Sequence, residues 1–244
     1  MSEALLNAGR QTLMLELQEA SRLPERLGDD FVRAANIILH CEGKVVVSGI
    51  GKSGHIGKKI AATLASTGTP AFFVHPAEAL HGDLGMIESR DVMLFISYSG
   101  GAKELDLIIP RLEDKSIALL AMTGKPTSPL GLAAKAVLDI SVEREACPMH
   151  LAPTSSTVNT LMMGDALAMA VMAGSITWAE KSRRSRDISL EVICTVTSRS
   201  RSIFTGTPPS FRSWGSTAPV KFLATNLLGR RAVTVSPTFT NSFS

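Results

Sequence analysis

Short apolar runs alternate with stretches of helical periodicity through the first two thirds of the chain. Five of these runs have the length of buried strands: residues 44–48, 71–75, 92–97, 116–122 and 136–141. Strands that are apolar on both faces and separated by helices indicate a parallel sheet covered on both sides. We therefore predict an α/β fold, a flavodoxin-like doubly wound sheet of five parallel strands.

Helical patterns flank this sheet in the sequence. Leucines from Leu5 to Leu23 predict an amphipathic N-terminal helix, and residues 31–39 predict a second helix that ends before Glu42 and Gly43. Residues 157–172 predict a Met-rich helix with hydroxyl residues at its N-terminal cap. The apolar faces of the first and last helices exceed what one such domain covers, so we expect a homodimer or homotetramer.

The composition changes near Ala173. Ser and Thr make up about a third of residues 173–244, and the hydrophobic periodicity disappears. Residues 1–172 hold 15 Lys and Arg against 19 Asp and Glu, a net charge of −4, whereas the remainder carries +7. We predict one domain over 1–172 and an irregular, disordered or non-native tail over 173–244. A mildly acidic domain argues against nucleic-acid binding as its main task.

Two glycine-rich loops each follow a predicted strand and precede a predicted helix. Residues 49–57 read Gly-Ile-Gly-Lys-Ser-Gly-His-Ile-Gly, and residues 97–101 read Ser-Tyr-Ser-Gly-Gly. Such turns direct backbone N–H groups and the positive end of a helix dipole at one point. At the carboxyl ends of neighbouring parallel strands, the two turns face one crevice. A small phosphorylated ligand is the expected occupant.

Two other phosphate-binding motifs resemble the first loop. Gly49, Gly51 and Gly54 match the dinucleotide pattern G-x-G-x-x-G, but residues 67–71 lack the carboxylate that holds a ribose hydroxyl. A P-loop requires a glycine where Val46 stands. A tight strand-to-helix turn without a ligand is the remaining alternative for this loop taken alone.

Several further motifs carry a family resemblance. These are Phe-Val-His-Pro at 73–76, His-Gly-Asp-Leu-Gly at 81–85, Glu-Ala-Cys-Pro at 145–148 and Leu-Ala-Pro-Thr-Ser-Ser-Thr at 151–157. With the two glycine loops, they make residues 1–172 resemble the sugar isomerase (SIS) domain of bacterial arabinose 5-phosphate isomerases. The resemblance implies interconversion of D-ribulose 5-phosphate and D-arabinose 5-phosphate, a step toward a lipopolysaccharide sugar. We expect neither a metal nor an organic cofactor, because a carboxylate or a histidine can carry out the proton transfer of such a reaction.

The aldose–ketose reaction requires a base that moves a proton between adjacent carbons. By family position, Glu104 and Glu145 are the candidate bases, and the sequence does not choose between them. Lys52 resembles the family's active-site lysine, which implies that it binds substrate oxygens or stabilises an enediolate, and His81 is a candidate for ring opening or proton relay. The structural alternatives are a first-turn helix glutamate for Glu104, a solvated loop for Glu145 and an exposed turn for Lys52. The expected substrate-binding residues are Gly51, Ser53, Gly54, His55, Ser97, Ser99, Gly100, Lys103, Thr154, Ser155, Ser156 and Thr157.

The chain departs from the family pattern in two places. Gly101 and Ala102 follow the Ser-x-Ser-Gly core where relatives carry a hydroxyl residue, so Lys103 is expected to compensate through its charge. The family's downstream histidine motif and its two CBS modules are not recognisable after residue 172. We interpret that region as a foreign or out-of-frame continuation, with a native basic tail as the alternative.

Two other functions stay open: an isomerase of another sugar phosphate, and a non-catalytic sugar-phosphate-binding module. Three cysteines without paired spacing indicate reduced thiols. The first residues have no signal-peptide pattern, and residues 166–173 are too short an apolar run to span a membrane. We therefore expect a cytoplasmic protein that binds neither membranes nor nucleic acid.

Overall fold

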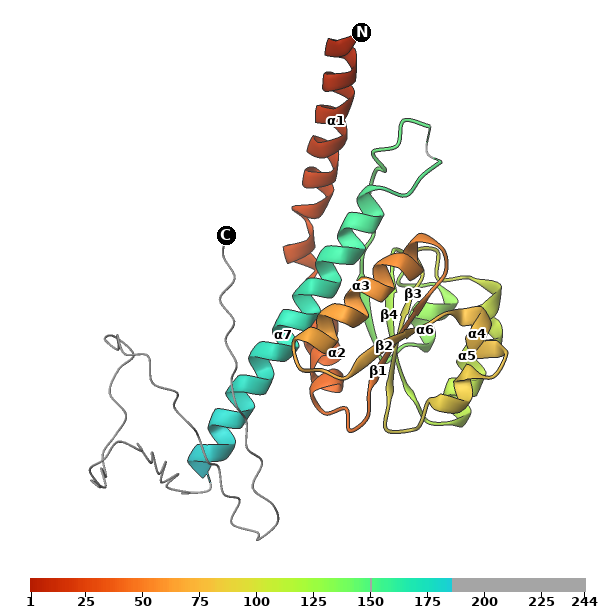
Figure 1. Cartoon of the computed structure of the whole chain (residues 1–244), viewed down its shortest axis with the longest axis vertical. Helices are drawn as coiled ribbons and strands as arrows, with labels where there is room; N and C mark the ends of the chain where they lie inside the picture. Colours follow the sequence, from red (N-terminus) through yellow and green to blue (C-terminus); the bar gives the residue numbers. More distant parts are fainter. Residues whose placement is uncertain (150, 186–244) are drawn as a thin grey trace, which may run out of the picture. The chain divides into compact units, whose positions relative to one another are not determined.

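The computed structural model describes residues 1–149 and 151–185, and five parallel strands form its central sheet (Figure 1). The strands are β1 (Val45–Gly49), β2 (Ala71–Val74), β3 (Val92–Ile96), β4 (Ala118–Thr123) and β5 (Ala136–Asp139). Their order is β2-β1-β3-β4-β5, and all pairs are parallel. This is the predicted flavodoxin-like order. The five strands predicted from apolar runs are confirmed.

Helices cover both faces of the sheet (Figure 1). On one face lie α2 (Asp29–Leu39), α3 (Lys52–Ser66) and α7 (Ser155–Ser185). The other face carries α4 (Pro76–Leu80), α5 (Lys103–Asp114), α6 (Pro129–Ala133) and the short 3-10 helix η2 (Asp83–Met86). Ahead of the sheet in sequence come α1 (Ser2–Ala20) and the 3-10 helix η1 (Leu23–Arg26).

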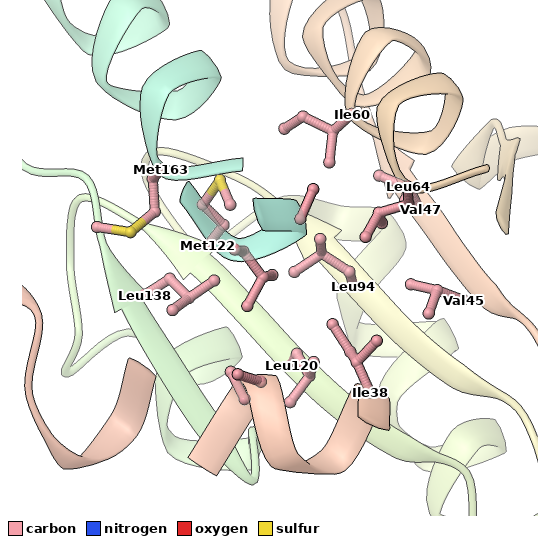
Figure 2. Packing of buried hydrophobic residues seen from close by; sticks show 14 of the residues in the cluster. Ile38, Val45, Val47, Ile60, Leu64, Leu94, Leu120, Met122, Leu138 and Met163 are labelled. Atoms are coloured by element: carbon pink, nitrogen blue, oxygen red, sulfur yellow. The ribbon is translucent and has the colours of Figure 1, made fainter. Parts of the chain in front are cut away.

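The strands are buried on both faces, which explains their continuous apolar sequences. Val45 and Val47 of β1 belong to the core beneath α2, α3 and α7, whereas Val46 belongs to the opposite core. Figure 2 shows the first of these cores, to which α3 contributes Ile60 and α7 contributes Met163. Because successive side chains of a strand point to opposite faces, each strand supplies both cores.

Helix α7 is longer than the sequence predicted. The predicted helix ended at Met172, but α7 continues to Ser185, so the irregular tail does not begin at Ala173. Ser175 and Thr177 satisfy their hydroxyls within the helix, by donating to the carbonyls four residues earlier at 2.8 and 3.1 Å. Gly174 also lies close to Leu39 of α2. The predicted irregularity of residues 186–244 lies outside the described residues.

The segment Ser155–Thr177 of α7 also corrects the expectation about membrane-spanning length. By length and composition, with a mean hydropathy of 1.4, it is long and apolar enough to cross a membrane. Core helices of soluble proteins pass the same test, which makes a single segment weak evidence. Met163, Leu167 and Val171 of this segment pack in the core against the sheet.

Candidate active site

The two glycine-rich loops begin side by side. Gly49, the last residue of β1, pairs in register with Ile96, the last residue of β3. From β1 the chain runs outward to the edge strand β2 and then returns to β3, on the other side of β1. This reversal is the topological switch point, where open α/β sheets bind ligands beyond the carboxyl ends of their strands.

The first loop leads directly into α3. Its N-cap residue Gly51 has a φ of +58°, a conformation that residues with side chains rarely adopt. A Cβ on Gly54 would lie 2.6 Å from the carbonyl oxygen of Gly49, so the helix meets the strand too closely for a side chain there. Among the residues that the structure describes, no side chain caps α3, which leaves its first N–H groups open to a ligand. Lys52 and His55 are exposed beside them, and Ser53 is half-buried.

The second loop leads into α5 in the same manner. Gly100 has a φ of +63°, and its N–H donates to the carbonyl and the hydroxyl oxygen of Ser97 at 3.1 and 3.2 Å. Ser99 and Lys103 are exposed. Glu104 is half-buried in the first turn of α5, and its side chain makes no hydrogen bond or ion pair with any residue that the structure describes. It is therefore an available carboxylate next to the predicted phosphate site.

Neighbouring segments hold this second loop in place. A Cβ on Gly100 would lie 1.9 Å from the hydroxyl oxygen of Ser128, the residue that caps α6. The N–H of Leu130 donates to the Gly100 carbonyl at 3.2 Å, and the N–H of Gly124 donates to the Tyr98 carbonyl at 3.0 Å. These bonds hold the loop in one conformation rather than leaving it a free turn.

Glu145 follows β5 and caps the N-terminus of α7. Its Oε2 accepts hydrogen bonds from the N–H and the hydroxyl of Thr154, at 2.7 and 3.0 Å, and from the N–H of Ser156 at 3.3 Å. Burial raises the pKa of Glu145, but hydrogen bonds from Ser156 and Thr154 outweigh burial and hold this pKa below its usual value. Glu145 is therefore an ionised helix cap. The alternative expected from the sequence, a glutamate in a solvated loop, is wrong.

The hydroxyl residues around this cap have different surroundings. Thr154 also accepts the N–H of Ala146 at 2.8 Å, and Thr157 donates its hydroxyl to the Thr154 carbonyl at 2.6 Å. Ser155 is fully buried, and its hydroxyl oxygen has no hydrogen-bond partner among the described residues. The structure thus joins Thr154 and Ser156 to Glu145 and gives Thr157 a local bond within the helix start.

His81 lies apart from these groups in the hydrogen-bond network. It is the exposed C-cap residue of α4, and its imidazole makes no hydrogen bond to Lys52, Glu104 or Glu145. Helix α4 packs against α5, the helix that carries Glu104. Its predicted role in ring opening or proton relay stays a prediction.

Side chains that the sequence did not single out hold the segment before Glu145. The Tyr98 hydroxyl accepts the N–H of Val142 at 3.2 Å, and Asn159 donates its side-chain amide to the Ser141 carbonyl at 3.2 Å. Tyr98 therefore links the Ser97 loop to the Glu145 segment. Its position inside the Ser-x-Ser-Gly loop was an available signal, whereas Asn159 reads as one more polar residue of a helix.

Comparisons with known proteins agree with this geometry. Arabinose 5-phosphate isomerase GutQ of Shigella flexneri is 99% identical over 172 residues, which cover 70% of this chain and 54% of that protein. Arabinose 5-phosphate isomerase KdsD of Pseudomonas aeruginosa is 55% identical over 167 residues, which cover 68% of this chain and 51% of that protein. The chain therefore spans about half the length of these relatives.

Solved structures show the same fold. An Escherichia coli protein in complex with arabinose 5-phosphate has a TM-score of 0.68 and 34% identity, and the match covers 74% of this chain and 99% of that one. A sugar-phosphate isomerase homologue from Listeria monocytogenes has a TM-score of 0.70 and 31% identity, with 76% and 97% covered. The family profile described as SIS domain matches residues 38–170. The chain therefore belongs to the SIS domain family.

Proposed function

We propose that this chain carries the site of an aldose–ketose isomerase that interconverts D-ribulose 5-phosphate and D-arabinose 5-phosphate. The observation that carries the proposal is the pair of uncapped helix N-termini, those of α3 and α5, that follow neighbouring strands at the switch point. The relatives named arabinose 5-phosphate isomerase support this substrate. We place the activity in the cytoplasm, because a charged sugar phosphate does not cross an apolar membrane unaided.

In this proposal the phosphate binds at the two helix N-termini. N–H groups of the first turns of α3 and α5 donate to its oxygens, as do the hydroxyls of Ser97 and Ser99. Lys52 and Lys103 are exposed at these helix starts and add positive charge. This arrangement requires a dianionic ligand and predicts weak binding of unphosphorylated sugars.

We assign the carbon-acid base to Glu104. Its carboxylate is free of hydrogen bonds and ion pairs within the described structure, whereas three hydrogen bonds keep Glu145 ionised as a helix cap. Glu104 removes the proton from C2 of the open-chain aldose and returns it to C1, while the hydroxyl proton moves from O2 to O1. Lys52 stabilises the negative oxygen of the enediolate, and His81 assists ring opening.

Binding and turnover test this proposal separately. Arabinose 5-phosphate at a hundredfold excess over its Kd is expected to stabilise the fold by about 2.7 kcal/mol, and arabinose is expected to have no effect. Glu104→Gln is expected to keep this binding and to lower the isomerase rate ~10²–10⁴-fold. Glu113→Gln, an exposed position on the same helix, is the matched control. A melting curve unchanged by millimolar arabinose 5-phosphate or ribulose 5-phosphate would refute the proposal.

A non-catalytic sugar-phosphate-binding module is the second candidate. The engagement of Glu145 as a structural cap favours it, because one of the two candidate bases then has a role in the fold. Replacing residues 173–244 by the continuation of the relatives distinguishes the two functions. For an enzyme that needs the family's downstream histidine, the chimera gains activity. For a binding module, both versions bind arabinose 5-phosphate and neither turns it over.

We also propose that the chain assembles with itself through α1 and α7. Leu5, Met14 and Met169 are 70%, 66% and 47% exposed, and an apolar groove of about 380 Å³ lies between Leu17 of α1 and Met162 of α7. Exposed apolar surface of this kind is typical of subunit contacts. Sedimentation at micromolar concentration is expected to show a dimer or tetramer. Leu17→Lys is expected to weaken the self-association, and Gln11→Lys, on the same helix, is expected to leave it unchanged. If the unmodified protein sediments as a monomer, the proposed assembly is wrong.

A further inference from the structure

The segment from Ser141 to Ala146, which carries Glu145, has no regular secondary structure, yet side chains bind most of its backbone N–H groups. Asp139 accepts the N–H of Ser141 at 2.8 Å, Tyr98 accepts that of Val142, and Thr154 accepts that of Ala146. The two remaining N–H groups before Glu145 belong to Glu143 and Arg144. Both are bound by one carboxylate from the other end of the chain.

That carboxylate is Glu19, in the last turn of α1. Its Oε2 accepts the N–H of Glu143 at 3.0 Å and its Oε1 accepts the N–H of Arg144 at 3.2 Å. Glu19 is only 2% exposed, although it lies on a helix whose other side chains are mostly exposed. Burying a carboxylate costs free energy that specific donors must offset. A side chain that only filled space here would be apolar, so the charge points to the two N–H groups.

Neighbouring cations complete the contact between the α1–η1 segment and this loop. Arg22 forms ion pairs with Glu19, at 3.9 Å, and with the side chain of Glu143. Arg26 of η1 donates to the carbonyl of Ser141. Glu19 and Arg26 therefore bind the backbone that leads to Glu145, and Arg22 pairs with the side-chain carboxylates of Glu19 and Glu143.

We propose that Glu19 is a positioning residue for Glu145. Binding the N–H groups of Glu143 and Arg144 fixes the backbone directly before Glu145, and this directs the Glu145 carboxylate toward Thr154 and Ser156. The part of this inference that concerns turnover rests on the proposed function, whereas the part that concerns loop order does not. Helix α1 is thereby coupled to the candidate active site.

Hydrogen exchange of the full-length chain tests the loop order without any ligand. In Glu19→Gln, the side-chain oxygen can still accept one of the two backbone N–H groups, but the new NH₂ group faces the second and cannot accept it. The backbone amides of residues 143–146 are therefore expected to exchange about tenfold faster. The amides of Thr154 and Ser156, which donate to Glu145, are expected to exchange faster as well. Strand β3 is expected to keep its protection, which separates this effect from global unfolding.

Two further variants provide a matched control and a substitute for Glu19→Gln. Glu16→Gln, one turn earlier on α1, is the matched control, because the Glu16 side chain makes no hydrogen bond or ion pair in the described part of the chain. Glu19→Asp keeps the charge on a side chain one methylene shorter and replaces Glu19→Gln if that variant does not fold. Unchanged exchange at 143–146, or equal acceleration throughout the protein, would overturn the proposal.

Turnover of arabinose 5-phosphate supplies the second readout. Because Glu145 is the second candidate acid–base group, Glu19→Gln is expected to lower kcat at least fivefold. KM should change little, because the phosphate-binding loops are untouched. An unchanged kcat beside faster loop exchange would overturn the part of this inference that concerns turnover. Absence of binding and turnover in the unmodified chain would refute the proposed function alone, and the exchange at 154–156 would then decide whether Glu19 positions Glu145.

Discussion

Glu145 stabilises the fold through the N-terminus of α7, and two substitutions separate its charge from its hydrogen bonds. Glu145→Gln keeps an oxygen that can accept the N–H of Thr154 and Ser156, but it removes the charge that faces the helix dipole. We expect a loss of about 1.5 kcal/mol in the free energy of unfolding, from weaker hydrogen bonds and the lost dipole interaction. Glu145→Ala also leaves three donors without this acceptor. Because water reaches the half-exposed site, we expect a total of about 3 kcal/mol.

The pH dependence gives this prediction a sign. The pKa of Glu145 in the folded protein lies below its usual value, because hydrogen bonds from Ser156 and Thr154 outweigh burial. A lowered folded pKa stabilises the protein above the unfolded pKa, about 4.3 for glutamate, and this contribution is lost as the pH falls through the folded value. The stability difference between the unmodified chain and Glu145→Gln should therefore be full at pH 7 and should shrink in acid.

Urea unfolding followed by circular dichroism, at pH 7 and at successively lower pH, measures these differences. Glu42→Gln is the control, since Glu42 is exposed and has no hydrogen bond or ion pair within the described residues. If Glu145→Gln costs as much as Glu145→Ala, or if its effect does not shrink in acid, the carboxylate does not act as a charged cap.

Three other changes test separate parts of the structure. Gly100→Ala places a Cβ 1.9 Å from a side-chain oxygen at a φ of +63°. We expect the free energy of unfolding to fall by at least about 2 kcal/mol, and a calorimetric titration to show weaker binding of arabinose 5-phosphate. Gly101→Ala meets no atom within 4 Å and should change neither. Tyr98→Phe removes the hydroxyl that accepts the Val142 N–H but keeps the ring. We expect the free energy of unfolding to fall by about 1 kcal/mol and the Val142 amide to exchange faster. Unchanged exchange would contradict the link between the Ser97 loop and the Glu145 segment. Asp91 is buried, and hydrogen bonds from Glu88 and Lys44 outweigh burial and hold its pKa below its usual value. Asp91→Asn should lower the free energy of unfolding, measured in urea, by about 3 kcal/mol at pH 7 and by less in acid. A loss that does not depend on pH would show that the charge of Asp91 is not the cause.

Much of the fold follows from local sequence. Continuous apolar runs such as 45–47 and 92–96 are typical of strands buried on both faces, and helical patterns between them indicate a parallel sheet. The glycine-rich loops are equally local, because Gly51 and Gly100 adopt positive φ values within a few residues of their strands. A prediction of a doubly wound sheet with a phosphate-binding crevice therefore needed no knowledge of long-range contacts.

Tertiary structure decided the features that depend on residues far apart in the chain. Glu19 and Glu143 are 124 residues apart, and nothing near Glu19 indicates that its carboxylate is buried against that backbone. The end of α7 could not be predicted either, since the Ser-rich sequence after Met172 is typical of a loop. In the structure, the hydroxyls of Ser175 and Thr177 donate to carbonyls of the preceding helical turn. Local patterns record which face of an element is apolar and where a turn needs glycine. They do not record which distant donor a carboxylate meets, because the folded path of the whole chain brings the two together.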